Sequence, residues 1–135
     1  MLMAMPKVIN IQSDLDIVAA RMAARDMAKA MGFGAIDQAR IATAISELAR
    51  NIYLYAGEGT VTVSEVQQGI RKGLEVICDD QGPGIEDISL VMTDGYTTSK
   101  GMGMGMPGAR RLMDDFEIIS IVGEGTKITC RKWKR

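Results

Sequence analysis

The spacing of the apolar residues changes near residue 57, and this change constrains the fold more than any other feature of the sequence. Beyond that point, residues 60–66 largely alternate Thr or Ser with Val, the pattern of a strand with one face toward solvent. Ahead of it, apolar residues recur at intervals of four, three and four, the spacing of one buried helix face: Ile41, Ile45, Leu48 and Ile52. The sequence therefore predicts helices in its first half and mostly strands afterwards.

The other elements follow from the same patterns and from residues that begin or end them. A first helix is expected from Ser13 or Asp14 to about Met31, and the second from about 36 to 55, ended by Gly57. The apolar positions of the first are Ile17, Val18, Met22, Ala24 and Met27. Strands are expected at 8–11, 60–66, 74–78, 116–122 and 127–133, and a helix at 109–113 with Pro107 in its first turn, while 85–92 is ambiguous. This order predicts an α+β sandwich, one sheet under a helical layer, as a single domain over residues 1–135.

Composition and charge exclude several classes of function. A hydrophobic content of 47% and a charged content of 24% are those of an ordinary soluble globule. The net charge of −1 gives no general attraction to nucleic acid or to an anionic membrane, so neither is expected as a partner. The basic run 131–135 is expected to be a solvated chain end with Trp133 packed back on the body. Because the chain has no His, any general base must be Asp, Glu or Lys.

The cysteines and the first residues of the chain indicate a cytoplasmic location. Cys78 and Cys130 lie in apolar, strand-like runs, so we expect buried thiols in a reducing compartment. Residues 1–7 contain neither a basic region of the kind that begins a signal peptide nor a sustained apolar run, so we expect neither a signal peptide nor a membrane span there.

The second predicted helix carries a pair of polar residues beside its apolar stripe. Glu47 and Asn51 are four positions apart, so both project from one face. On helix evidence alone they form a half-exposed pair in which Glu47 also reaches Arg50. If a phosphate and Mg²⁺ lie nearby, Asn51 offers the ion a neutral oxygen and Glu47 supplies a base.

A polar turn, residues 80–84 with the sequence DQGPG, follows the strongly apolar strand LEVIC. Asp, Gly and Pro are ordinary turn residues, and a plain strand-ending turn explains them. Gly82 and Gly84 also let a flat ligand approach the backbone. The Asp80 carboxylate would accept a hydrogen bond from the exocyclic amino group of adenine and would face the carbonyl oxygen of guanine unfavourably. The turn is therefore a candidate adenine site.

Alternating Gly and Met at 101–106 form a segment that is both flexible and apolar. Gly103, Gly105 and Gly108 satisfy G-x-G-x-x-G, but the residues ahead of them are polar and not the strand that a dinucleotide site requires. The sequence also lacks the Walker pattern and the lysine strand, H-R-D and D-F-G of protein kinases. What remains is a glycine loop delivering amides to the start of a helix, an anion site. Lys100 and the hydroxyls of Thr97, Thr98 and Ser99 suit phosphate oxygens.

Taken in order, these segments resemble a known superfamily. The series ELARN, DQGPG, the glycine run and GEGT resembles the GHKL ATPases, which include gyrase-type ATPases and sensor histidine kinases. The runs GFGAIDQARIATAISELARNIYLYAG, DDQGPGI, PGARRLMDDF and GEGT further resemble the switch serine-protein kinases of the RsbT type, over nearly the whole chain. The resemblance implies the Bergerat fold: a two-layer sandwich whose mixed, mostly antiparallel sheet is covered on one face by helices.

The resemblance also implies roles for individual residues. Glu47 matches the proposed general base, Asn51 the Mg²⁺ ligand and Asp80 the aspartate that recognises adenine, with Gly82 and Gly84 shaping the pocket. The mobile ATP lid is matched by Gly101, Gly103 and Gly105, and the last sequence box by Gly125 and Thr126, whose hydroxyl supports the adenine site. Ser99 and Lys100 are expected phosphate contacts on chemical grounds alone. We further expect the lid methionines, Met102, Met104 and Met106, to exchange packing on the body for contact with a partner.

The leading hypothesis is an ATP- and Mg²⁺-dependent protein serine/threonine kinase. By resemblance its substrate is a STAS-domain partner or stressosome scaffold, and once released the kinase activates a PP2C-type phosphatase. One alternative is a nucleotide-gated binding module that binds ATP and transfers nothing. A second, the catalytic half of a histidine kinase, is disfavoured because the chain contains neither a phosphoacceptor His nor dimerisation helices.

Overall fold

Residues 5–92 and 105–135 are described by the structure, a computed structural model, and they form four helices and five strands. In chain order these are β1 (Lys7–Ile11), α1 (Asp14–Met31), α2 (Ala35–Ala56), β2 (Gly59–Gln68), β3 (Arg71–Asp80), α3 (Ile88–Val91), α4 (Gly105–Leu112), β4 (Asp115–Ile121) and β5 (Gly125–Trp133). The expected helices and strands are therefore present, and the ambiguous stretch 85–92 contains the short helix α3. The expectation of one domain over 1–135 extends beyond the described residues and stays a prediction.

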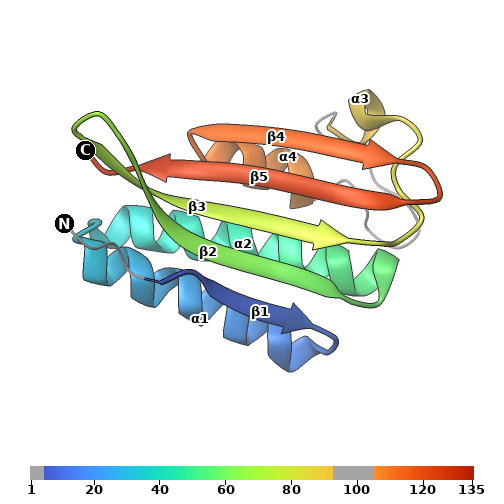
Figure 1. Ribbon diagram of the computed structural model, residues 1–135, viewed down its shortest axis with the longest axis horizontal. Coiled ribbons are helices and arrows are strands. Elements are labelled where there is room, and N and C mark those ends of the chain that lie inside the picture. The colour runs from blue at the N-terminus through green and yellow to red at the C-terminus, as the bar shows by residue number, and fades with distance from the viewer. Residues whose placement is uncertain (1–4, 93–104) are drawn as a thin grey trace.

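The five strands form one sheet in the order β1-β2-β3-β5-β4. Helices α1, α2 and α4 lie on one face of it, and none of the described helices covers the opposite face (Figure 1). The α+β sandwich is confirmed, but the expectation of a mixed sheet is wrong for the described residues, since all four strand pairings are antiparallel. The reason is topological: each strand reaches its neighbour by a hairpin or a return that reverses direction.

The core lies between the helical layer and the sheet. Its fully buried large side chains come from both layers and include the stripe predicted on α2: Ile11, Ile41, Ile45, Leu48, Val61, Val63, Leu74, Val76 and Cys130. Because strand side chains alternate between faces, the inward residues of β2 and β3 meet this stripe directly. Both cysteines are free and buried, as expected.

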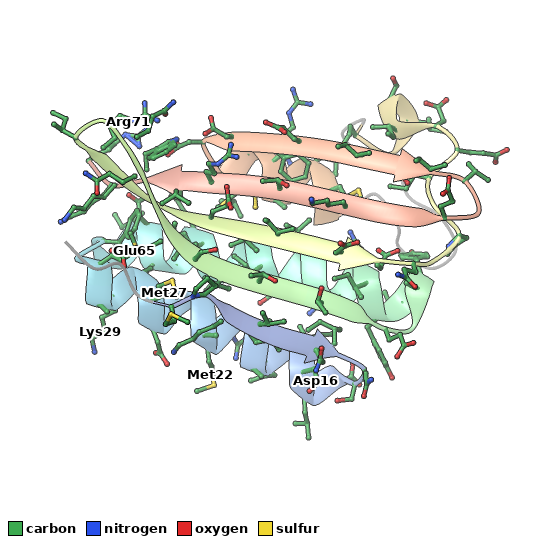
Figure 2. The ribbon with its side chains drawn as sticks, viewed as in Figure 1. Asp16, Met22, Met27, Lys29, Glu65 and Arg71 are labelled. Atoms are coloured by element: carbon green, nitrogen blue, oxygen red, sulfur yellow. The ribbon has the colours of Figure 1, made fainter. Side chains whose placement is uncertain are left out.

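The predicted buried face of α1 was partly wrong. Met27 is 5% exposed and lies between the helix and the sheet, whereas Met22 is 55% exposed and points away from the body (Figure 2). Val18 is also exposed, so the buried stripe consists of Ile17, Ala20, Ala24, Met27 and Ala28. The sequence pattern did not separate the two faces because Ala and Met occupy both.

The ends of α1 show which residues fix its limits. Ser13 occupies the N-cap position, but its side chain makes no capping bond. Instead the Asp16 carboxylate accepts hydrogen bonds from the Gln12 backbone N–H at 2.8 Å and the Ser13 hydroxyl at 3.2 Å. At the other end Gly32 has a φ of 90°, the left-handed conformation in which glycine commonly ends helices.

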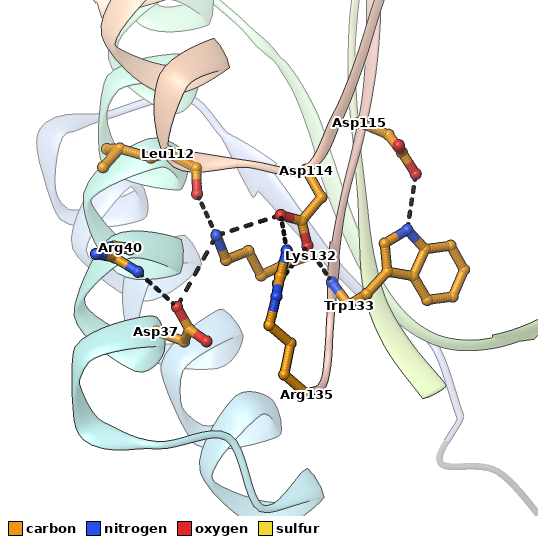
Figure 3. Close-up of polar contacts among 8 residues, drawn as sticks. All are labelled: Asp37, Arg40, Leu112, Asp114, Asp115, Lys132, Trp133 and Arg135. Carbon is orange, nitrogen blue, oxygen red and sulfur yellow. Dashed lines mark hydrogen bonds and ion pairs between the residues drawn. The ribbon is translucent and has the colours of Figure 1, made fainter. Parts of the chain in front are cut away.

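The last strand holds the C-terminal end of α4 through a buried lysine. Lys132 is 6% exposed, and its Nζ donates to the Leu112 carbonyl oxygen at 2.9 Å. The same Nζ lies 3.6 Å from Asp114 Oδ1 and 3.9 Å from Asp37 Oδ1, so it links α2, α4 and the start of β4 (Figure 3). The expectation that the basic run is simply solvated is therefore wrong for Lys132.

Trp133 packs back on the body, as predicted. Its backbone N–H donates to Asp114 Oδ2 at 2.7 Å and its indole Nε1–H to Asp115 Oδ2 at 2.9 Å (Figure 3). The guanidinium of Arg71 lies 4.1 Å from the ring centroid, a cation–π contact. These contacts close the end of the sheet opposite Asp80.

No helix in the described residues combines the length and the apolar character that a membrane span requires.

Candidate functional site

The residues predicted from four separate sequence segments meet at one end of the sandwich. Asp80 ends β3, Thr126 lies at the start of β5, and Asn51 projects from the last turns of α2. Together they line one cavity, whose wall is Leu48, Asn51, Ile52, Tyr55, Cys78, Asp80, Pro83, Gly84, Ile85, Met106, Thr126 and Ile128. The predicted adenine site, metal ligand and last sequence box are thus neighbours in space.

The cavity is narrow. Its free space is about 30 Å³, enough for about two water molecules and too little for a purine ring. Met106, the second residue of α4, is 3% exposed and forms part of the wall. Met106 was expected to pack on the body in one state, and here it does so against the candidate nucleotide site.

Asp80 is held at the strand end by its own turn. Its Oδ1 accepts a hydrogen bond from the Gly82 backbone N–H at 2.9 Å. Burial raises the pKa of the Asp80 carboxyl above its ordinary value, and hydrogen bonds from the Gly82 and Thr126 backbone oppose that rise. The strand was expected to end at residue 78, but Asp79 and Asp80 still pair with Thr60 and Gly59 on β2. Because of this pairing, the backbone of Asp80 belongs to the sheet, and its carboxylate is not carried by a loop.

Gly82 and Gly84 are required by the packing of the chain itself. A Cβ at Gly82 would lie 2.7 Å from the Ala56 Cβ, at the end of α2. A Cβ at Gly84, which has a φ of +78°, would lie 2.5 Å from the Ile121 carbonyl oxygen. Both distances are shorter than real Cβ contacts allow, so the two glycines let the turn fit between α2 and β4. That they also admit a ligand stays a prediction.

A pair of hydroxyls completes the polar side of the cavity. Ser120 on β4 faces Thr126 across the strand pair, and their hydroxyl oxygens are 2.7 Å apart. The Ile85 backbone N–H donates to Ser120 Oγ at 2.8 Å. Sequence reasoning missed Ser120, although a signal was available: β4 alternates Phe116, Ile118 and Ser120 toward the helices, which makes Ser120 a polar residue at a core position.

Glu47 and Asn51 lie one turn apart on α2, as predicted, but their surroundings differ. The Arg50 Nη1 lies 2.9 Å from Glu47 Oε1, the local ion pair that the sequence also allowed. A Cβ at Gly105 would lie 2.7 Å from Glu47 Oε2, so the first residue of α4 sits against this carboxylate. The Asn51 Nδ2 is buried and has no hydrogen-bond partner within the described residues. A buried amide left without a partner is costly, and such groups commonly await a ligand or water.

The donor set suits Mg²⁺ in a limited sense. The described residues contain no group of three His, Cys, Asp or Glu side chains that could hold a metal ion. Mg²⁺ in nucleotide sites is bound through one or two protein ligands plus phosphates and water, so a single side chain such as Asn51 fits this chemistry. Turning the Asn51 amide would present its oxygen in place of the unpartnered nitrogen.

The predicted lid lies mostly outside the described residues. Ser99, Lys100, Gly101 and Gly103 belong to that part of the chain, as do Met102 and Met104, and their roles stay predictions. Gly105, also assigned to the lid, is the first residue of α4. The helix therefore begins four residues before the predicted start, with Pro107 in its first turn as expected.

Comparison with known proteins defines the class. Residues 36–135 match the family "Histidine kinase-, DNA gyrase B-, and HSP90-like ATPase". The RsbU and RsbW domains of a Mycobacterium tuberculosis protein superpose with a TM-score of 0.63 at 19% identity, over 98% of this chain and 33% of that one. The mycobacterial sensor histidine kinase MprB superposes at 0.56 and 17% identity, over 97% and 99% of the two chains. The chain belongs to this ATPase family, and its chemistry uses ATP.

Sequence similarity narrows the class further. Serine/threonine-protein kinase RsbT of Bacillus subtilis is 57% identical over 127 residues, which cover 94% of this chain and 96% of that protein. Anti-sigma F factor of Thermoanaerobacter sp. is 35% identical over 101 residues, covering 70% and 69%. The chain is a serine/threonine-protein kinase of the RsbT type.

Proposed function

We propose that the chain transfers the γ-phosphoryl group of ATP, with Mg²⁺, to a serine of a STAS-domain partner in a partner-switching pathway. One observation carries the proposal: the Asp80 carboxylate, the Thr126 hydroxyl and the unpartnered Asn51 amide line the same cavity, and Glu47 lies one helical turn away. The similarity to RsbT supports the choice of a protein hydroxyl as acceptor.

Each residue has a separate part in this chemistry. Asp80 would accept a hydrogen bond from the exocyclic amino group of adenine. Asn51 would hold Mg²⁺ through its amide oxygen, and the bound ion would neutralise phosphate charge. Glu47 takes the hydroxyl proton of the partner's serine while the serine oxygen attacks the γ-phosphorus. The bond between the γ-phosphorus and the bridging oxygen breaks, and ADP leaves. Gly82 and Gly84 hold the adenine side in shape, and Ser99, Lys100, Gly101, Gly103 and Gly105 contact the phosphates.

Access to the site requires α4 to move at its N-terminal end. Met106 forms part of the cavity wall, and Gly105 rests against Glu47. We infer that nucleotide binding displaces both together and removes the Gly105 contact from the Glu47 carboxylate, whose side chain is already 36% exposed. The same movement would offer a partner a surface that depends on nucleotide.

The proposed pathway extends the similarity to RsbT and to anti-sigma F factors. The substrate is a STAS-domain protein or a stressosome scaffold built from such proteins, and release from it lets the kinase activate a PP2C-type phosphatase. A cytoplasmic location fits this pathway. Neither nucleic acid nor a membrane takes part in it.

The direct test uses radiolabelled ATP with a purified STAS-domain partner. Wild-type protein should place acid-stable label on a serine, whereas acid-labile label would indicate a phosphohistidine. Glu47→Gln should bind ATP normally and transfer about 10²- to 10⁴-fold more slowly, the range for a lost general base. Glu117→Gln is the matched control, because Glu117 is exposed at 67% on the far face of the sheet.

A nucleotide-gated binding module remains the second candidate. The Glu47–Arg50 ion pair favours it, because a carboxylate held by its own helix is less available as a base. Stoichiometric ATP binding by the wild type, with no phosphoserine formed on any STAS partner, would support the module and contradict the kinase mechanism.

A further inference from the structure

Ser120 lies at a branching point of hydrogen bonds beside the candidate adenine site. Its Oγ accepts from the Ile85 backbone N–H at 2.8 Å, lies 2.7 Å from Thr126 Oγ1, and can donate to the Gly125 carbonyl oxygen at 3.2 Å. Thr126 is 9% exposed and lines the cavity, and the register places it directly opposite Asp80. Ser120 therefore acts on the cavity through Thr126.

Counting protons gives this pair two arrangements. A hydroxyl donates one hydrogen, and the Ile85 N–H already occupies one acceptor position of Ser120. If Ser120 donates to the Gly125 carbonyl, the 2.7 Å contact requires Thr126 to donate to Ser120, and Thr126 offers the cavity only an acceptor. If Ser120 donates to Thr126, the Thr126 proton is free to point into the cavity.

The second arrangement matches adenine. On the edge of adenine that carries the amino group, the donor is the amino group and its neighbour N1 is an acceptor. Asp80 can accept a hydrogen bond from the amino group, so the protein group that faces N1 must be a hydrogen-bond donor. Changing from the first arrangement gives up only the 3.2 Å bond to Gly125 and keeps the 2.7 Å bond between the hydroxyls. Short O–H···O bonds near 2.7 Å are the stronger ones.

We propose that Ser120 is a positioning residue for nucleotide recognition: by donating to Thr126 Oγ1, it directs the Thr126 proton toward N1 of the purine. This inference rests on the proposed nucleotide site. It adds a second hydroxyl to the recognition of adenine, and it ties that recognition to the 80–85 turn through the Ile85 N–H. A hydroxyl that accepts a hydrogen bond is also a better donor, because neighbouring bonds polarise one another.

The test compares ATP with 1-deaza-ATP, in which a C–H replaces N1. The readout is the ratio of the two dissociation constants. Wild-type protein should bind ATP about 2- to 13-fold more tightly, the net worth of one neutral hydrogen bond. Thr126→Val should reduce the ratio to about 1, and Ser120→Ala should reduce it part of the way. Ser120→Thr, which keeps the hydroxyl, should restore it. If Ser120→Ala fails to fold, Ser120→Cys takes its place in the test, because it keeps nearly the same side-chain size with only a weak donor. Ser120→Cys should then also reduce the ratio part of the way.

The outcomes separate the inference from the site on which it rests. A wild type that does not bind ATP contradicts the nucleotide site itself. A wild type that binds ATP and 1-deaza-ATP equally contradicts the donor role of Thr126. If Ser120→Ala or Ser120→Cys weakens both nucleotides by the same factor and leaves the ratio unchanged, Ser120 only supports the fold and the inference is wrong.

Discussion

The two ends of the sheet differ in how their buried polar groups are satisfied. At the end formed by Asp114 and Trp133, the Lys132 ammonium has the Leu112 carbonyl and two carboxylates around it (Figure 3). At the Asp80 end, the Asn51 amide nitrogen is buried without a partner within the described residues. The first end is complete in itself, whereas the second retains a hydrogen-bonding group that no described residue uses. We infer that the first stabilises the fold and that the second gives up stability for binding.

The largest effect is expected at the complete end. Lys132→Met keeps most of the side-chain volume but leaves the Asp114 and Asp37 carboxylates without the ammonium. Removing one partner from a buried ionic cluster costs about 3–5 kcal/mol, so urea denaturation should show a loss of this size. ATP affinity of the folded variant should stay within about twofold, since the change lies at the far end of the sheet.

Lys134→Ala is the control for this prediction. Lys134 is exposed, and its truncation should change the free energy of unfolding by less than about 0.5 kcal/mol. A loss below 1 kcal/mol for Lys132→Met would mean that the cluster contributes little to the fold, and the contrast between the two ends would fail.

The next effect is on binding, at the open end. Asp80→Asn keeps an oxygen for the Gly82 N–H but removes the charge. Because a hydrogen bond to a charged group contributes ~1.5–3 kcal/mol, ATP affinity should fall about 10- to 150-fold by titration calorimetry. Asp79→Asn is the matched control, since Asp79 is the adjacent residue of β3 and is exposed. Normal ATP binding by Asp80→Asn would remove Asp80 from the site.

These contrasts also explain how far the sequence could predict the structure. Glu47, Asn51 and Asp80 were found because each belongs to a local pattern: a helical interval or the end of an apolar strand. Lys132 and Ser120 were not, because their roles depend on partners distant in sequence, namely the Leu112 carbonyl and the Ile85 N–H. The run RKWKR has the composition of a solvated tail, and only the register of β5 turns Lys132 inward.

A third substitution, at the open end, should change stability in the opposite direction to Lys132→Met. Asn51→Leu replaces an amide with an unpartnered buried nitrogen by an apolar side chain of similar size. Since an unsatisfied buried polar group costs about 1–3 kcal/mol, this variant should gain about 1 kcal/mol of stability while losing Mg²⁺-dependent nucleotide binding. Asn10→Leu, at an exposed strand position, should change neither property. Destabilisation by Asn51→Leu would indicate that the amide is already satisfied, and equal loss of ATP binding in chelator would count against the metal role.

The smallest effect concerns pH and comes from Asp80. Burial raises the pKa of this carboxyl in the folded protein, so protonation begins at a higher pH than for an ordinary aspartate. The ionised carboxylate can accept a hydrogen bond from the adenine amino group, whereas the protonated form places its own proton on one of the two oxygens. ATP affinity should therefore fall as pH is lowered toward the raised pKa, about twofold at the pKa itself, where half of the molecules are competent.

The effect of the same group on folding runs the other way. A raised carboxyl pKa contributes stability that is fully present below the ordinary value and is lost as pH rises through the folded one. Mild acid should thus weaken binding without any loss of stability from Asp80. Asp80→Asn measured over the same pH range corrects for titration of the phosphates, and an identical pH profile in both proteins would show that Asp80 does not govern binding.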